Sequence, residues 1–462
     1  MPWDDIIYVS LLLLCIVFGH WYRQIKNRQH RQWVSTILGL TVISIASGYH
    51  AIHPIICIVV NAIIITQLSW KVCHIVSFCF TFFYLLGFFR LADWYGLPLP
   101  SAHANLIQMM LTLKLSGMAF EVNSAAQAPK DDAQGMNAEA FRKIGFMDVI
   151  HYGSTYIGIL TGPYYRYRTY WDSLHRPFSD QADHLSVTCT KFKQIVPFAL
   201  IHLLFNYTFP AKYALTDDFG TRSFLYRFCY IYPTFVTFRT RMYTGMALSE
   251  CVCTMSGLGA YPTSCETISG LGPKNYKAIE SLTFPHCRSK DPDKAMKEAL
   301  DFETVHNINF WGVESCVLVR TAMKMWNTCV QYWMATCVYK RFPYKPLRTL
   351  FTLTLSAVWH GYHAGYYLCI CSITFFLPME DIYVKFYNQT KEGNLTKKGL
   401  GLLMWFLKST CMAYLGISFQ LLKLEETLAY YNSVYYAGQL LVVILYIVGL
   451  VLKPFILEKS KV

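Results

Sequence analysis

The chain has 462 residues, of which 54% are hydrophobic, 16% are aromatic and only 15% are charged. Together with a mean hydropathy of +0.29, this composition excludes a soluble globular protein of this length and predicts an all-α, polytopic membrane protein. The net charge of +13 does not favour nucleic-acid binding, because the basic residues flank apolar runs and form no soluble basic face. It indicates membrane orientation and attraction to anionic headgroups.

Apolar runs long enough to cross a bilayer, or nearly so, recur along the whole chain. They cover residues 6–21, 33–46, 55–70, 72–89, 106–120, 146–160, 195–210, 224–238, 317–338, 350–377, 401–422 and 434–456. Several are shorter than the roughly 20 residues that an upright helix needs, so we expect some of them to be re-entrant. The sequence therefore predicts about 11 transmembrane helices plus re-entrant segments.

The first apolar run predicts a retained helix with its C-terminal end in the cytosol. Asp4 and Asp5 precede this run, where a signal peptide would carry basic residues, and Arg23 and Lys26 follow it. Alternating spans then place residues 121–143 in the cytosol, in agreement with the basic residues at the end of that segment.

Two later segments do not fit simple alternation. If residues 146–160 crossed the membrane, the basic residues at 166–193 would become lumenal, so we predict that 146–160 is re-entrant. The basic loop 250–303 then lies in the cytosol, but the basic cluster at 340–348 remains lumenal against the rule. The glycosylation sequons at Asn388 and Asn394 fall in a loop predicted to be cytosolic, so we expect both to be unmodified.

The chain shows no internal repeat and is interpreted as one membrane-embedded domain, 1–462. Residues 1–120 are predicted to form a peripheral helical bundle. Residues 146–377, which contain unusual polar and aromatic residues, are predicted to form the catalytic core. Residues 401–462 are predicted to form the C-terminal helices. An active centre is expected in the core.

The 16 cysteines are scattered along the chain and indicate small core residues in a reducing or lipid setting. The exception is a group in one loop, Cys251, Cys253, Cys265 and Cys287, with His286 nearby. Their spacing lacks the paired C-x-x-C pattern that zinc prefers, so no metal is predicted.

Residues 158–168 combine a helix break at Gly162-Pro163 with an aromatic and cationic cluster that includes Tyr164 and Arg166. Such a cluster at a membrane face suits a phosphorylated amphiphile, because Arg binds phosphate and Tyr favours the interface. An interfacial aromatic belt with snorkelling arginines is the alternative interpretation.

Residues 320–333 are predicted to be helical, which places Met323, Asn327 and Gln331 on one face, beside Trp326 on the next stripe. A buried Asn demands hydrogen-bond partners. It either joins packed helices or holds a reacting atom.

Residues 356–367 place His360 within an apolar run, where an ionisable side chain is costly and indicates a functional site. The alternative is a tolerated core histidine. His360 and His363 are expected to share a helical face, but no carboxylate lies between them, so a zinc site is not favoured. Gly361 and Gly365 suit the close approach of a helix or a ligand chain.

The pattern Trp359-His360-Gly361-x-x-x-Gly365-Tyr366, with Trp326-Asn327 upstream, resembles the membrane-bound O-acyltransferase (MBOAT) family. The block 161–170 is similar to another family segment, and the resemblance covers nearly the whole chain. Within the family, residues 257–262, 320–327 and 356–368 are closest to the lysophospholipid branch, and in it to the lysophosphatidylinositol acyltransferases. Ala364 departs from this branch, where Pro is frequent, and we expect it to affect helix geometry beside the site.

The resemblance implies transfer of a fatty acyl group, with polyunsaturated chains expected, from acyl-CoA to the sn-2 hydroxyl of a lysophospholipid in phospholipid remodelling. It identifies His360 and Asn327 as catalytic. The expected substrate-binding residues are Trp326, Trp359, Tyr366, Gly162, Pro163, Tyr164, Arg166 and His363. The resemblance implies acyl-CoA and lysophosphatidylinositol as partners, no cofactor and no metal, and residence in the endoplasmic reticulum membrane.

Two alternative functions are also compatible with parts of the sequence. One keeps the fold but acylates another lysophospholipid or a protein, and the cytosolic basic loops argue against a protein substrate. The other is a transporter whose intramembrane histidine relays protons, for which repeated halves and aligned ionisable residues are expected, and neither is evident.

Overall fold

The computed structural model describes residues 3–128, 139–141, 144–176, 178–281, 299–391 and 393–457. Helices make up most of these residues, and the strands among them are four segments of two residues each. The predicted all-α class is therefore confirmed. Part of the topology and cysteine predictions falls on residues outside the described ranges. These are residues 142, 143, 286, 287, 288, 290, 294 and 297.

The chain forms two compact units. The first comprises Met1–Ile195, Gly245–Asn307 and Thr328–Val338, and the second comprises Val196–Thr244, Ile308–Asn327 and Tyr339–Val462. Helices α9 (His184–Thr208) and α12 (Ile231–Met255) each contribute residues to both units. The predicted single membrane domain with its three subdivisions stays a prediction.

The first unit is a helical bundle with a small strand-containing region. Its helices are α1 (Trp3–Tyr22), α2 (Arg28–Ser47), α3 (Ile52–Gln67), α4 (Cys73–Phe83), α5 (Ala102–Gln127), α6 (Phe146–Ser154), α7 (Tyr167–His175), α8 (Phe178–Gln181), α13 (Tyr276–Ser281) and α16 (Thr328–Trp333). Strand β1 (Tyr261–Pro262) pairs antiparallel with β4 (Leu300–Asp301), and β2 (Thr267–Ile268) pairs antiparallel with β3 (Gly272–Pro273).

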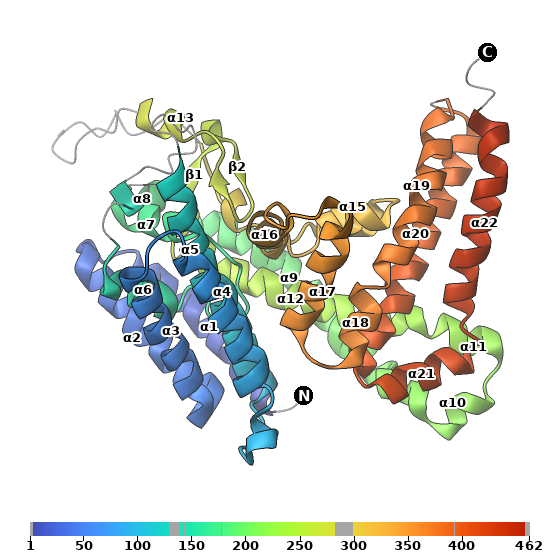
Figure 1. The fold of residues 1–462 in the computed structure, drawn as a ribbon, viewed down its shortest axis with the longest axis horizontal. Coiled ribbons are helices and arrows are strands. Elements are labelled where there is room, and N and C mark those ends of the chain that lie inside the picture. Colours follow the sequence, from blue (N-terminus) through green and yellow to red (C-terminus); the bar gives the residue numbers. More distant parts are fainter. Residues whose placement is uncertain are drawn as a thin grey trace. The chain divides into compact units, whose positions relative to one another are not determined.

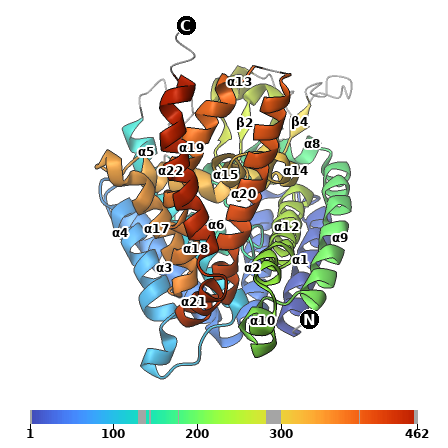
Figure 2. The same cartoon turned by 90° about the vertical axis from the view of Figure 1, so that its right-hand side faces the viewer.

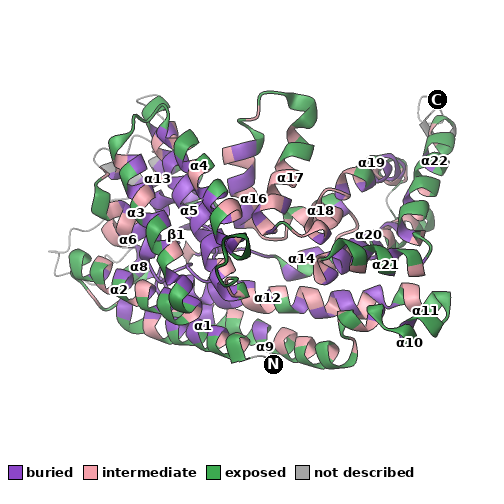
Figure 3. Cartoon of the chain, turned by 60° about the horizontal axis from the view of Figure 1, so that its bottom comes forward, coloured by how far each residue is buried: buried purple, intermediate pink, exposed green. Residues whose placement is uncertain are grey.

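Helix α5 is the centre of this bundle. It packs against α3 and α4 (Figure 1), and most of its side chains are buried all round (Figure 3), which includes the side chain of Lys114. The Lys114 ammonium lies over the rings of Tyr152 and Tyr165 and donates a 3.3 Å hydrogen bond to the Tyr165 hydroxyl. A helix that is buried on every side tolerates such an ionisable group only with partners of this kind.

The second unit consists of helices and connecting loops. Besides its parts of α9 and α12, it contains α10 (Asp217–Thr221), α11 (Phe224–Cys229), α14 (Phe310–Ser315), α15 (Val319–Lys324), α17 (Arg348–His360), α18 (Ala364–Ile370), α19 (Ile373–Gln389), α20 (Leu395–Leu421), α21 (Leu424–Ser433) and α22 (Ala437–Leu457). Helices α19, α20 and α22 lie side by side (Figure 2), and their apolar faces enclose a shared core.

Five helical runs among the described residues are long and apolar enough to cross a membrane: Trp3–Tyr22, Arg28–Gln67, Ala364–Gln389, Leu395–Leu421 and Ala437–Pro454. Helix α22 turns Leu440, Ile444, Ile447 and Val451 outward, which is the pattern of a lipid-facing helix. The multi-pass membrane class is confirmed, but the count of about 11 spans is not. Helix α6 has nine residues and spans roughly 14 Å at 1.5 Å per residue, and the re-entrant placement of residues 146–160 stays a prediction.

Candidate active site

His360 is the last residue of helix α17. The helix ends there because Gly361 adopts an extended conformation, while its amide still donates a 3.0 Å hydrogen bond to the Ala357 carbonyl. His363 precedes helix α18, so the prediction that His360 and His363 share one helical face is wrong. The negative end of the α17 dipole lies at His360 and favours positive charge on its imidazole.

The glycine after His360 makes room for Tyr366. A Cβ atom at Gly361 would lie 2.5 Å from Cε2 of the Tyr366 ring, far inside van der Waals contact. Without that atom, the Tyr366 ring lies against the His360 imidazole, with centroids 5.8 Å apart and planes at 29°. The absence of a side chain at Gly361 therefore allows the Tyr366 ring to pack against the His360 imidazole.

The second glycine of the motif brings helix α20 to the same place. A Cβ atom at Gly365 would lie 2.1 Å from the Ser418 carbonyl oxygen, and the Gly365 amide donates a 2.8 Å hydrogen bond to the Leu422 carbonyl. This approach places the ring of Phe419, which lies next to Ser418 on α20, 5.0 Å from the His360 ring at 80°.

Three aromatic rings thus surround a half-buried His360. The centroid of the buried Trp359 ring lies 4.9 Å from that of the His360 imidazole. The rings of Tyr366 and Phe419 also contact the imidazole, and their own centroids are 4.8 Å apart. Such a setting holds the imidazole in a fixed orientation while leaving part of it accessible.

Asn327 lies in a break between two short helices. Helix α15 ends at Lys324 and α16 begins at Thr328, so the prediction of one helix over 320–333 is wrong. Asn327 itself has a φ of +51°, in the left-handed region where Asn is enriched among non-glycine residues. The face shared by Met323, Asn327 and Gln331 therefore does not form.

Backbone hydrogen bonds hold the break from both sides. The Asn309 amide donates to the Met325 carbonyl at 3.0 Å, and the Thr328 amide donates to the Asn307 carbonyl at 2.8 Å. The carboxamide oxygen of Asn327 is buried and has no hydrogen-bond partner within the part of the chain that the structure describes. A buried polar atom without a partner is costly, so this position suits a group that arrives with a substrate.

A row of rings links the two predicted catalytic residues within the second unit. His360 contacts Phe419, Phe419 contacts Phe238 at 5.2 Å, and Phe238 stacks on Trp326 at 6.4 Å with planes at 6°. Trp326 directly precedes Asn327. The sequence motifs around 326 and 360 are therefore joined by aromatic packing from α12 and α20.

The other predicted binding residues, Gly162, Pro163, Tyr164 and Arg166, lie in the first unit. Gly162 has a φ of +94° and is followed by a cis peptide bond to Pro163. Tyr164 and Arg166 are each only 2% exposed, and the Arg166 guanidinium pairs with Glu121 at 3.2 Å and donates to the Leu271 carbonyl at 3.3 Å. Their role in substrate binding stays a prediction, and in the structure Arg166 bonds to protein groups.

The sequence motifs do not include Phe419 and Phe238. Both lie in ordinary apolar runs, where nothing in the local pattern separates them from lipid-facing or core residues. Only the close approach of α18 to α20 at Gly365 shows that Phe419 belongs to the site.

No group of three or more His, Cys, Asp or Glu residues with the arrangement of a metal site occurs among the described residues. Cys251, Cys253 and Cys265 are buried with free thiols, whereas His286 and Cys287 of the same predicted group lie outside the described residues.

The fold and site define a multi-pass helical membrane protein with a histidine at a helix end and an asparagine in a helix break. The sequence model of the MBOAT, membrane-bound O-acyltransferase family, matches residues 101–423, and the chain belongs to this family.

Several curated relatives cover almost the whole chain. The chain is 39% identical over 457 residues to the membrane-bound acylglycerophosphatidylinositol O-acyltransferase frj of Drosophila melanogaster, covering 95% of this chain and 90% of that protein. It is 33% identical to the human membrane-bound acylglycerophosphatidylinositol O-acyltransferase MBOAT7, and the match covers 93% of this chain and 90% of that protein. It is 28% identical to mboa-7 of Caenorhabditis elegans, covering 100% and 98%.

Proposed function

We propose that this protein transfers an acyl group from acyl-CoA to the sn-2 hydroxyl of lysophosphatidylinositol, in the endoplasmic reticulum membrane, with a preference for polyunsaturated chains. The observation that carries the headgroup is the shared name of its full-length relatives, which act on acylglycerophosphatidylinositol. The residues expected from the family, His360 and Asn327, both lie in one unit that also holds the candidate spans α19, α20 and α22.

His360 acts as the general base in this proposal. It takes the proton from the sn-2 hydroxyl as the oxygen attacks the thioester carbonyl carbon, and it returns that proton to the CoA sulfur when the C–S bond breaks. Imidazole suits this step, because its reference pKa of ~6.5 lets the group take up and return a proton near neutral pH. The end of helix α17 stabilises the imidazolium that forms between the two transfers.

Asn327 holds the reacting groups in place. A carboxamide can accept a hydrogen bond from the attacking hydroxyl or present its NH₂ to the developing oxyanion, and one end of this carboxamide is buried without a partner. Because a thioester is already activated, positioning and proton transfer suffice, and the reaction requires neither a covalent enzyme intermediate nor a cofactor.

A radiometric assay on the purified, detergent-solubilised chain tests the substrate. Labelled polyunsaturated acyl-CoA is supplied with lysophosphatidylinositol, lysophosphatidylcholine or lysophosphatidylserine in turn, and a saturated acyl-CoA is compared in parallel. We expect kcat/KM to be at least about tenfold higher with lysophosphatidylinositol, which is a difference of about 1.4 kcal/mol in transition-state binding. Equal rates with the three lysolipids would limit the function to a general lysophospholipid acyltransferase.

The base is tested with His360→Ala, which we expect to abolish transfer while expression and detergent-solubilised folding persist. The matched control is His30→Ala, an exposed histidine in the first turn of helix α2, which should leave the rate unchanged. Substantial activity in His360→Ala would remove this residue from the base role.

A further inference from the structure

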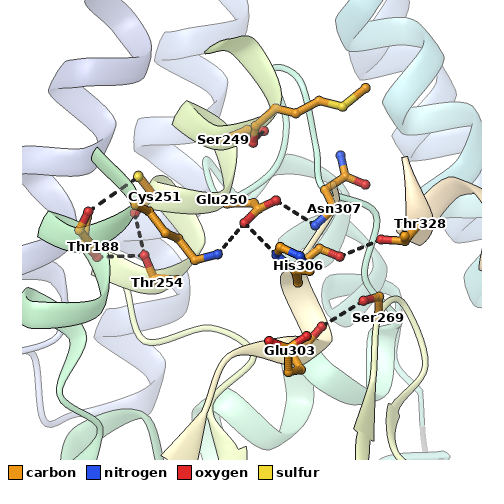
Figure 4. A network of polar contacts seen from close by, with 12 residues as sticks. Thr188, Ser249, Glu250, Cys251, Thr254, Ser269, Glu303, His306, Asn307 and Thr328 are labelled. Atoms are coloured by element: carbon orange, nitrogen blue, oxygen red, sulfur yellow. Dashed lines mark hydrogen bonds and ion pairs between the residues drawn. The ribbon is translucent and has the colours of Figure 1, made fainter. Parts of the chain in front are cut away.

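A buried carboxylate on helix α12 is the centre of a polar network that neither sequence motif contains (Figure 4). Glu250 is 2% exposed, and its carboxylate receives three donors. Lys191 on α9 donates to Oε2 at 2.5 Å, the His306 ring nitrogen Nδ1 lies 3.4 Å from the same oxygen, and the Asn307 amide donates to Oε1 at 2.7 Å.

Lys191 and His306 favour the charged form of Glu250. Burial by itself raises the pKa of Glu250, but the charge of Lys191 and the hydrogen bond from His306 lower it below its usual value. A buried carboxylate that stays ionised binds its donors with charge-assisted hydrogen bonds, which are about twice as strong as neutral ones. The Asn307 backbone is therefore held firmly at this point.

Asn307 in turn holds the beginning of helix α16. Its carbonyl accepts the Thr328 amide at 2.8 Å, and its side-chain Oδ1 accepts the Cys329 amide at 3.4 Å. The Thr328 hydroxyl adds a 2.7 Å hydrogen bond to the His306 carbonyl. These are the first two residues of α16, whose amides lack partners within the helix, so segment 306–307 caps this helix from outside.

Asn327 directly precedes that capped turn. We infer that Glu250 is a positioning residue of the acyl transfer, acting through Asn307 and the first turn of α16 to fix the backbone from which the Asn327 side chain projects. This inference rests on the proposed function, since it assigns Glu250 a role in the same reaction. Asn327 has a φ of +51° and does not lie in a continuous helix. Its backbone therefore depends on the hydrogen bonds made on either side of it.

A purely structural role for Glu250 makes a different prediction. Buried charge clusters also stabilise folds, and removing one partner commonly costs stability without touching the reaction of the molecules that remain folded. A positioning role changes kcat per folded molecule, because a displacement on the order of 1 Å at a catalytic group is enough to cost up to roughly a hundredfold in rate. The split between kcat and stability separates the two roles.

The first test is Glu250→Gln in the full-length, detergent-solubilised protein. Glutamine still accepts the Asn307 amide, but its NH₂ group then faces Lys191 and His306, which are donors themselves. We expect kcat per folded molecule to fall about tenfold or more, with KM for acyl-CoA and for lysolipid nearly unchanged, since the lost interaction acts in the transition state.

Asp172→Asn is the matched control. Asp172 is also 2% exposed and accepts hydrogen bonds from Arg168 and from the hydroxyls of Tyr261 and Tyr276 in the first unit. Its network does not reach the first turn of α16 through any of these bonds. We expect Asp172→Asn to lower thermal stability while kcat of the folded fraction stays within about twofold of wild type.

A double-mutant cycle with Asn327→Ala isolates the connection. If Glu250 acts through Asn327, then Glu250→Gln should lower kcat in the wild-type background and have no further effect once the Asn327 side chain is removed. Equal fold reductions in both backgrounds, or a Glu250→Gln kcat within twofold of wild type, would overturn the inference. A wild-type protein without acyl transfer would instead overturn the proposed function.

Should Glu250→Gln fail to fold, Asn307→Ala provides the same test. It leaves the backbone amide that Glu250 binds but removes the Oδ1 atom that accepts the Cys329 amide. We expect a smaller drop in kcat, again absent in the Asn327→Ala background. An unchanged kcat in Asn307→Ala would show that the cap of α16 does not control the reaction.

Discussion

The ring of Phe419 meets the imidazole of His360 edge-on, with centroids 5.0 Å apart and planes at 80°. Phe419 lies on α20, while His360 ends α17, and the contact exists because Gly365 of α18 packs directly on the backbone of α20. The same phenylalanine also contacts Tyr366 and Phe238. It therefore joins the rings around the proposed base to those beside Trp326.

Replacement of Phe419 should reduce catalysis through the orientation of His360. An aromatic pair contributes about 0.5–1.5 kcal/mol, so we expect Phe419→Ala to lower kcat, by up to roughly tenfold. Phe419→Leu fills more of the space than Phe419→Ala and should therefore lower kcat less. Phe406→Ala on the same helix serves as the control, because Phe406 is 49% exposed and contacts Tyr232. Equal kcat values for Phe419→Ala and wild type would exclude this role.

Three substitutions of Asn327 separate its backbone from its side chain. Asn327→Gly accommodates a φ of +51° without strain, whereas Asn327→Ala adds roughly 1–2 kcal/mol of left-handed strain. We expect both to lower kcat by about a hundredfold, by analogy with removing an oxyanion donor, and only Asn327→Ala to lower the melting temperature as well.

Asn327→Asp decides which end of the carboxamide acts. Aspartate keeps the size and the acceptor oxygens but cannot donate when ionised, so it should be as inactive as Asn327→Gly if the NH₂ group serves the oxyanion. Activity close to wild type in Asn327→Asp would mean that the oxygen orients the hydroxyl. Full activity in Asn327→Gly would return this residue to a packing role.

The sequence identified the class of fold and the central residues of the candidate site, but not how they are supported. His360, Gly361 and Gly365 form one local pattern, and composition alone defines a multi-pass membrane protein. The break at Asn327 was not predictable from periodicity, because the residues on either side of it both follow a helical period. Its cause is tertiary, namely the hydrogen bonds from segment 307–309.

The number of spans was hard to predict for a related reason. Helices such as α5 and α12 mix apolar and ionisable residues, and the partners that compensate Lys114 and Glu250 come from distant segments. A hydropathy pattern records each residue without its partner. It therefore cannot distinguish a membrane span from a helix that the protein itself buries.

Substitution of Gly365 should separate α18 from α20. The added Cβ atom of Gly365→Ala would meet the Ser418 carbonyl oxygen at 2.1 Å, which is backbone and cannot rotate away. We expect a loss of roughly 1–3 kcal/mol in stability, as for other overpacked sites, and a fall in kcat because Phe419 moves with α20. Thermal unfolding and the acyl-transfer rate are measured on the same sample.

Gly399→Ala on α20 is the control for that experiment. Nothing lies within 4 Å of a Cβ atom at Gly399, and alanine favours a helix over glycine by about 1 kcal/mol. This variant should be as stable as wild type or more so, with an unchanged rate. Full activity and stability in Gly365→Ala would contradict the close packing of α18 and α20.

The charge of His306 should make stability depend on pH. Burial and the Lys191 charge lower the pKa of His306, but its hydrogen bond to Glu250, with the charges of Glu250 and Glu303, raises it above the usual 6.5. Because the folded-state pKa is raised, protonated His306 contributes stability that is fully present below pH 6.5 and is lost as the pH rises through the folded-state pKa. We therefore expect the melting temperature of wild type to fall as the pH rises above 6.5, and that of His306→Gln to change less. Parallel curves for the two proteins would show that His306 is neutral in the folded state, and Glu250 would then depend on Lys191 alone for its charge partner.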